Sequence, residues 1–423
     1  MISELIWALP FVLLLACIAI LPLAQKHWWE KNFQFVSAGL ALIVIVHYVF
    51  QLKHSEILFH TALEYFSFIC LIGSLFIVSG GIHINVKGEA TPLVNCVFLA
   101  IGAVLANLLG TTGASMVLVR PWIRMNKYRI TAFHTVFFIF IVSNVGGGLT
   151  PIGDPPLFLG YLKGVPFFWV LQNVWAIWFL AIGILLAVFF VLDSANFKKA
   201  PLEVRKKETA HEEWKFLGTH NVLFLAMILG AVFINQPPFL REAVMIAAAT
   251  LSYFTTPKPV HESNDFNFGP IREVAILFAG IFMTMIPALE WLEKYASALG
   301  ITSVGQFFWG SGMLSSVLDN APTYLNFLSA ALGLFGSGEA AHAGNVGVRM
   351  LLETHPNYIK AISVGSVFFG AVTYIGNGPN FLVKSIADQS GVKTPSFFGY
   401  FFRYSLPILI PIFFIIWLTF FRS

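Results

Sequence analysis

The sequence S-N-V-G-G-G-L-T-P-I-G-D-P-P-L-F-L at positions 143–159 decides the fold, because it interrupts an apolar run with glycine, proline and one acid. Glycine and proline at this density break a helix. Apolar residues continue on both sides. We therefore expect a membrane helix that is broken inside the bilayer, where protein or water must satisfy the freed backbone groups. The breaking residues are Gly146, Gly147, Gly148, Pro151, Gly153, Pro155 and Pro156.

A second copy of this segment lies 223 residues later in the chain. Positions 366–382 read S-V-F-F-G-A-V-T-Y-I-G-N-G-P-N-F-L, and both copies share T-x-I-G-x-x-P-x-F-L. Gly376, Gly378 and Pro379 break the second helix. A single break can be a kink needed only for packing. Two related breaks favour an internal repeat that builds a binding site.

An apolar stretch with a polar centre precedes each copy, at 92–119 and at 303–334. Arms of about 15 residues on either side of the centre are too short to cross a bilayer, which takes about 20. We therefore expect two re-entrant hairpins whose tips lie near mid-membrane. The tips hold Thr111, Thr112 and Ser115 in the first hairpin, and Asp319, Asn320 and Thr323 in the second.

Composition places the chain in a lipid bilayer. Only 11% of its residues are charged, whereas soluble domains have about 25%. The apolar runs predict an all-α polytopic membrane protein with about ten to eleven transmembrane helices besides the two hairpins. A net charge of +4 is too small to suggest nucleic acid as a partner. Three cysteines in apolar segments suggest neither a disulfide nor a zinc site.

Basic residues predict the orientation. Arg120, Arg124, Lys127 and Arg129 follow the first hairpin, and the loop at 193–218 is rich in lysine and arginine. Both segments should face the cytoplasm, which places the N-terminus outside a multi-pass protein of the inner (plasma) membrane. The first hairpin then opens to the cytoplasm and the second to the exterior, so the two repeats have inverted topology. Residues 335–357 become an exterior loop.

Asp154 and Asp319 are the candidate ion-binding acids. Each lies in an apolar context, where a carboxylate costs at least ~2.5 kcal/mol at the bilayer centre. Helix capping is the alternative, because Asp154 precedes Pro155 and Asp319 lies shortly before Pro322. Burial disfavours the charged form, which suits a carboxylate that alternates between a proton and a metal ion.

Neutral oxygen ligands accompany these acids. Hard cations such as Na⁺ take oxygens from carboxylates, amides, hydroxyls and backbone carbonyls. Contacts between helices are the alternative role for each neutral residue. We expect no resident cofactor, with Na⁺ and H⁺ as the transported or coupling ions. The neutral candidates are Thr111, Thr112, Ser115, Asn144, Thr150, Asn320, Thr323, Thr373, Asn377 and Asn380.

Other classes of function find little support in the sequence. His47 and His134 lie in apolar runs, and we expect them to pack against neighbours and not to carry protons. The motifs H-E-x-x-H and G-x-S-x-G are absent from the sequence, so an enzyme is not expected. A channel could use the same polar tips, but an inverted repeat suits alternating access better.

Two motifs resemble the ion transporter superfamily, which includes citrate and dicarboxylate carriers, arsenite pumps and NhaD-type sodium/proton antiporters. S-N-V-G-G-G-L-T-P-I-G-D-P-P at 143–156 and S-S-V-L-D-N-A-P-T at 315–323 are similar to the NhaD-type and citrate-transporter-like branch. The resemblance implies an elevator-type fold, often dimeric. Its parts are scaffold helices at 1–91 and 166–302, a transport domain at 92–165 and 303–390, and a C-terminal helix at 391–423.

The hairpin tips depart from the Ser-Asn-Thr motifs of dicarboxylate carriers, since they read Gly-Thr-Thr-Gly at 110–113 and Asp-Asn-Ala-Pro-Thr at 319–323. No basic residue stands at either break to pair with a carboxylate substrate. We therefore expect a sodium/proton antiporter that exchanges Na⁺ for H⁺ at midplane carboxylates. The alternative is a sodium-coupled carrier of citrate, a dicarboxylate or an arsenite-type anion. The expected partners are the bilayer, the small ion and a second copy of the chain.

Overall fold

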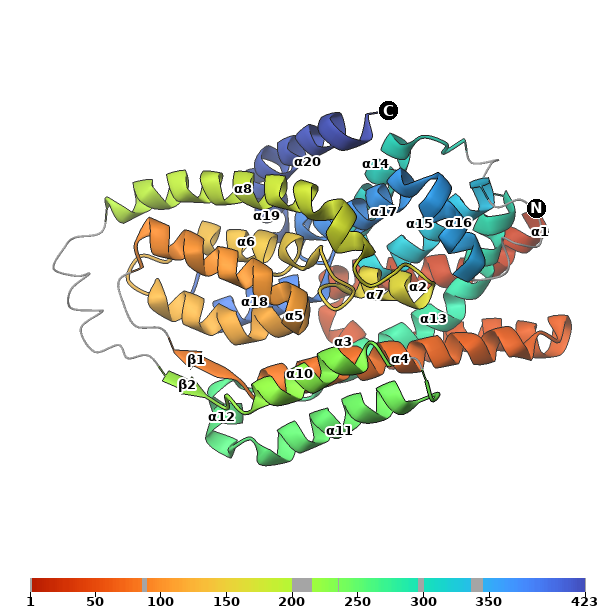
Figure 1. The fold of residues 1–423 in the computed structure, drawn as a ribbon, viewed down its shortest axis with the longest axis horizontal. Coiled ribbons are helices and arrows are strands. Elements are labelled where there is room, and N and C mark those ends of the chain that lie inside the picture. Colours follow the sequence, from red (N-terminus) through yellow and green to blue (C-terminus); the bar gives the residue numbers. More distant parts are fainter. Residues whose placement is uncertain are drawn as a thin grey trace.

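The computed structural model describes residues 2–85, 90–199, 215–234, 236–295, 300–335 and 345–422, and these are mostly helical (Figure 1). The long apolar helices identify a polytopic membrane protein. In the described residues, the helices long and apolar enough to cross a membrane are His27–Leu52, Ser55–Gly80, Pro92–Met125, Trp169–Phe197, Gly269–Tyr295 and Phe397–Phe421. Shorter apolar helices are Ile6–Pro22, Ala132–Gly147 and Asn221–Ala231.

The elements follow one another along the chain, with short 3-10 or π turns between or after several of them. The helices are α1 (Ile2–Leu5), α2 (Leu9–Ala24), α3 (Lys26–Val46), α4 (Ser55–Gly80), α5 (Pro92–Met125), α6 (Ala132–Ile141), α7 (Pro155–Leu162), α8 (Trp169–Phe197), α10 (Asn221–Ala231), α11 (Leu240–Thr255), α12 (Lys258–Ser263), α13 (Gly269–Tyr295), α14 (Val304–Val317), α15 (Asn320–Phe335), α16 (Asn345–Thr354), α17 (Pro356–Phe368), α18 (Gly378–Gln389), α19 (Phe397–Tyr400) and α20 (Ile410–Ile416).

The helices pack as two groups. The outer group consists of α2, α3, α4, α10, α11 and α13, and the inner group of α5, α6, α7, α14, α15, α17 and α18. The groups meet where α15 packs on α13 and where α5 packs on α4. In Figure 1, α5, α6 and α18 lie at one end of the inner group, and α14, α15 and α17 lie at the other.

Helix α5 folds back on itself at Gly110. This glycine has φ 75° and ψ 155°, a conformation that residues with a side chain rarely adopt. Asn95 and Asn126 would be about 46 Å apart in a straight helix. Their side chains instead hydrogen-bond each other, with Asn95 Nδ2 donating to Asn126 Oδ1 at 2.8 Å. The two arms of α5 are therefore antiparallel neighbours.

A second fold-back joins α14 to α15. The two helices are separated only by Leu318 and Asp319. Their rings meet where Phe307 and Phe327 lie edge to face, with centroids 5.8 Å apart. A side chain on Gly310 would press against the same Phe327 ring. Small residues thus let the arms approach closely.

Each half also contains two short helices with unwound chain between them, α6 and α7 in the first half and α17 and α18, which come after α16, in the second. The same glycine contact recurs in both halves. A Cβ on Gly153 would collide with the carbonyl oxygen of Gly147, and a Cβ on Gly376 would lie 2.7 Å from the carbonyl oxygen of Gly370. Both pairs are related by the 223-residue shift found in the sequence.

Some segments differ from the sequence expectations. The all-α class needs one addition, because β1 (His83–Asn85) pairs antiparallel with β2 (Lys215–Leu217). The segment 335–357 is not simply a loop, since α16 forms within it and buries Val348 and Leu351. Likewise α8 continues into the expected loop 193–218, most of which, at 200–214, lies outside the described residues.

Candidate ion-binding site

The two broken helices meet at their caps. Asp154 is the N-cap of α7 and Asn377 is the N-cap of α18. Asn377 Nδ2 donates to Asp154 Oδ1 at 3.1 Å. These are the positions that the sequence repeat aligns, so equivalent residues of the two halves form a buried contact.

Asp154 also accepts hydrogen bonds from residues at the turns of both fold-backs. Thr111 Oγ1 donates to Asp154 Oδ1 at 2.8 Å, and Asn320 Nδ2 donates to Asp154 Oδ2. The carboxylate is buried, with Asp154 only 1% exposed. Its side chain makes no capping bond to the α7 backbone. The capping alternative is therefore wrong for this side chain, which instead ties four segments together.

Four helix N-termini converge on this carboxylate. They belong to the second arm of α5, which starts after Gly110, and to α7, α15 and α18. Each N-terminus carries a partial positive charge of about +0.5. Together they would stabilise a negative charge on Asp154, and the three described side chains that bond this acid are all neutral.

Asp319 lies beside this junction, at the turn of the second fold-back. Its Oδ1 accepts from the Ala321 backbone N–H at 3.1 Å, so this acid does cap a helix. Thr323 Oγ1 donates to the Asp319 backbone oxygen at 3.0 Å. Asp319 is only partly buried, and it interacts electrostatically with Asp154. The structure thus brings the two predicted acids together, and Asp319 is more exposed to solvent than Asp154.

Several backbone carbonyls at the breaks accept hydrogen bonds from side chains. Asn380 Nδ2 donates to the oxygens of Gly370 and Thr373 at 2.8 Å each. Asn144 Nδ2 donates to the Ile139 oxygen at 2.9 Å. Thr150 and Thr373 donate in equivalent ways, to the backbone oxygens of Asn107 and Ser316. Amide side chains therefore support the unwound backbone at both breaks.

Two residues outside the predicted site complete this backbone support. Asn107 Nδ2 and Trp178 Nε1 both donate to the Gly146 oxygen, at 2.7 and 3.0 Å. Asn107 Oδ1 also accepts from the Leu149 backbone N–H at 2.9 Å. The sequence signal for Asn107 is its place in an apolar arm just before the tip. Trp178 lies on α8 and offers no such signal.

One buried acceptor at the junction has no hydrogen-bond partner within the described residues. It is Oδ1 of Asn320, whose side chain is fully buried and whose Nδ2 contacts Asp154. An unpaired buried oxygen is costly unless something binds it. With the Asp154 and Asp319 carboxylates, it forms the set of oxygens that a small cation could use.

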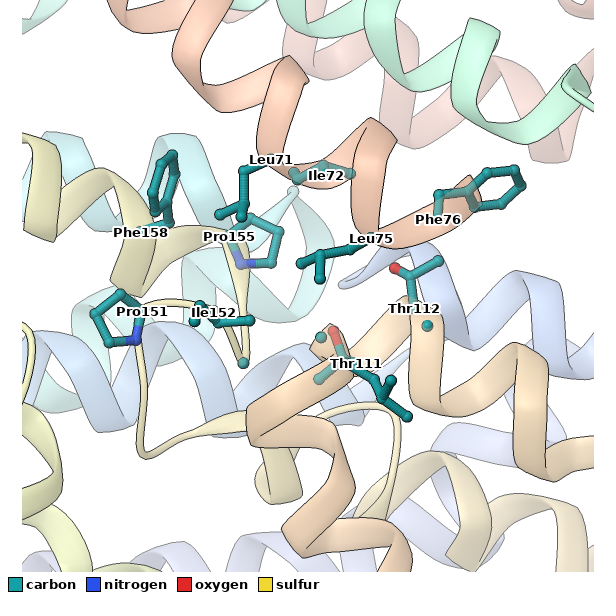
Figure 2. A pocket seen from close by; sticks show the side chains of 14 residues that line it. Leu71, Ile72, Leu75, Phe76, Thr111, Thr112, Pro151, Ile152, Pro155 and Phe158 are labelled. Carbon is teal, nitrogen blue, oxygen red and sulfur yellow. The ribbon is translucent and has the colours of Figure 1, made fainter. Parts of the chain in front are cut away.

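A small pocket opens beside the first tip (Figure 2). Thr111, Thr112 and Ile152 line it on one side, and Leu71 and Leu75 of α4 line it on the other. Its volume of about 30 Å³ fits one water or a bare ion, for which about 10–15 Å³ suffices. Ser115, the remaining hydroxyl candidate, does not line this pocket. Its Oγ hydrogen-bonds Ser143 Oγ at 2.8 Å.

Comparison with known proteins identifies the family. A family model described as "Putative citrate transport" matches residues 2–421. The chain belongs to this family. An uncharacterized transporter of Mycobacterium tuberculosis is 24% identical over 365 residues, which cover 79% of this chain and 80% of that relative. A "46 kDa membrane protein" of Mycobacterium leprae is 23% identical over 350 residues, covering 77% and 76%.

Membership of this family identifies the chain as a transporter. It supports the broad resemblance inferred from the motifs, whereas the antiporter branch stays a prediction. In the described residues, no group of three or more His, Cys, Asp or Glu side chains forms a metal cluster.

A second buried ionic cluster of the transporter lies at the base of the first fold-back. Arg129 binds both carboxylate oxygens of Asp193, with Nη2 donating to Oδ2 at 2.9 Å. Asn95 Nδ2 donates to the same oxygen at 2.8 Å. The Arg129 and Asp193 side chains are 2% and 0% exposed. This cluster fastens both ends of α5 to α8.

His134 belongs to this cluster and not to the ion site. Its Nδ1 accepts from the Thr131 backbone N–H at 3.2 Å, so its Nε2 carries the proton and donates to Asp193 at 3.0 Å. A second proton, on Nδ1, would point at the Thr131 backbone N–H, which is itself a donor. His47 stacks on Trp7, with ring centroids 3.5 Å apart, and bonds Gln51. Both contacts agree with the packing roles expected for these histidines.

Proposed function

We propose that this transporter exchanges Na⁺ for H⁺ at Asp154, with Asp319 and Asn320 Oδ1 as further ligands. The observation that carries the proposal is a buried carboxylate that, among the described residues, is bonded only by neutral side chains. An unpaired amide oxygen stands next to it. Such a site can release a proton and take a hard cation in its place. A carboxylic acid would then become a carboxylate that binds Na⁺, and one proton would leave.

The fold supports alternating access by movement of the inner group. The two fold-backs would be re-entrant hairpins, and their place at opposite ends of the inner group in Figure 1 agrees with inverted repeats. The inner group would slide along α4 and α13 of the outer group. The pocket between α4 and the first tip is apolar on the α4 side, which suits a sliding contact. Inverted repeats are a common plan for such carriers.

We also propose the orientation and assembly predicted from the sequence. Arg120 and Arg124 would face the cytoplasm and the N-terminus the exterior of the inner membrane. The outer group would form the contact in a homodimer, as in elevator-type carriers. Neither proposal affects the chemistry at Asp154, because every residue that bonds this acid comes from the inner group of one chain.

Transport in proteoliposomes tests the exchange. A pH gradient should collapse when Na⁺ is added, and D154N and D319A should slow this collapse at least about tenfold. The matched control is D388N, because Asp388 lies on exposed α18 surface and pairs with Lys384; it should keep the wild-type rate. A gradient that Na⁺ leaves intact, or D154N that exchanges normally, would overturn the proposal.

Carriage of citrate or a related anion is the second candidate. The four converging N-termini favour it, because they would attract a carboxylate whenever Asp154 and Asp319 are protonated. The family description also names citrate. Uptake of labelled citrate into the same vesicles separates the two: uptake that depends on Na⁺ without collapse of an imposed pH gradient would establish the second candidate and reject the first.

A further inference from the structure

Polar side chains lie along one side of α15, and one of them, Ser329, contacts α13. Asp319, Asn326 and Ser329 follow one another at spacings of seven and three residues, which place them on one side of a helix. Asn326 and Ser329 are 8% and 6% exposed. The contact with α13 is one of the places where the inner and outer groups meet. Polar groups therefore lie along a boundary that moves in the proposed transport cycle.

An acid of α13 meets this polar face. Ser329 Oγ donates to Glu293 Oε1 at 3.1 Å. The helices are in close contact there, because a Cβ on Gly333 would collide with the Glu293 backbone. One turn away, Oδ1 of Asn326 is buried and has no hydrogen-bond partner in the described part of the chain. A carboxylate, a hydroxyl and an unpaired amide oxygen thus lie near one another.

The position of Glu293 connects it to one side of the membrane. Arg120, in the basic segment after the first fold-back, pairs with Asp265 at 2.8 Å, just before α13 begins. Glu293 is near the other end of the same helix, about 36 Å along its axis from Gly269. It therefore lies on the side opposite the basic segment. Asn326 is about 10 Å along α15 from Asp319.

We propose that Glu293, Ser329 and Asn326 form a second, weaker site for a monovalent cation, which receives Na⁺ from the side opposite the basic segments and passes it to Asp319 and Asp154. The inference rests on the proposed cation exchange. Its oxygen ligands are those that hard cations prefer. The competing role for the same contact is a hydrogen bond that only holds α15 against α13.

Sided transport measurements test this approach site. In vesicles of known orientation, E293Q should raise the KM for Na⁺ about tenfold on the Glu293 side, leaving the maximal rate and the opposite-side KM unchanged. N326D should lower the same KM, because it adds a charge at the site. The matched control is E290Q, since Glu290 lies one turn earlier and accepts from Tyr48 Oη at 2.6 Å; it should behave as wild type.

The outcomes separate this inference from the function on which it rests. If E293Q lowers the maximal rate equally from both sides, the contact only supports packing and the site is overturned. If the wild type exchanges Na⁺ normally but E293Q leaves the KM for Na⁺ unchanged, the approach site alone is overturned. Lack of Na⁺ exchange by the wild type overturns the proposed function and the approach site together.

Discussion

Moving the central carboxylate from α7 to α18 is expected to preserve transport. D154N alone should slow cation exchange about 100-fold, equivalent to about 2.7 kcal/mol, because it removes the exchangeable group. The double variant D154N/N377D should recover to within about tenfold of wild type. Asp154 Oδ1 and Asn377 Nδ2 are 3.1 Å apart, so the carboxylate stays at the same junction.

The backbone supports this exchange of residues. Asp154 has φ −144° and ψ 142°, and Asn377 has φ −153° and ψ 139°. Both are N-caps, so each side chain leaves its helix in nearly the same direction. N377D alone is the matched control, and it should impair transport because two carboxylates would face each other. A double variant that folds but is as inactive as D154N would contradict the account.

Loss of Asp193 is expected to cause the largest fall in stability. D193A leaves Arg129 buried without its bidentate partner and removes an acceptor from His134 and Asn95. Breaking one side of a buried ion pair costs about 3–5 kcal/mol. The free energy of unfolding of the purified protein in detergent should therefore fall by this amount. The midpoint temperature of its thermal unfolding should fall as well.

D388A gives the control for that experiment. Asp388 also pairs with a basic residue, Lys384, but its side chain is 43% exposed. A surface pair of this kind contributes about 0–1 kcal/mol, so the thermal transition should barely move. Equal losses in D193A and D388A would show that the Arg129 cluster does not hold the base of the first fold-back.

Much of the site followed from the internal repeat. The sequence named Asp154, Asn377, Thr111 and Asn320 as candidates. It did not predict which of them bond one another. Local patterns of glycine, proline and isolated acids carry this information, because each is costly in an apolar helix and needs a specific environment. The roles of Asn144 and Asn380 did not follow. Both amides bond backbone, and residue type alone does not separate a backbone donor from an ion ligand.

Long-range partners were beyond the sequence. Arg129 was assigned to a basic loop, yet it is buried against Asp193, 64 residues away in the chain. Charge patterns predict which side of a membrane a segment faces, but they do not tell which acid a given arginine binds. The same limit applies to Trp178 and Glu293, which take their roles from helices that meet only in the folded chain.

Proton release on Na⁺ binding tests the central claim most directly. Na⁺ would be added to the purified protein in weakly buffered detergent solution, and the pH would be recorded. D154N would be measured in the same way. The account predicts that Na⁺ displaces protons from wild type, up to about one per chain from Asp154, and that D154N loses this release. No release from wild type, or the same release from D154N, would contradict it.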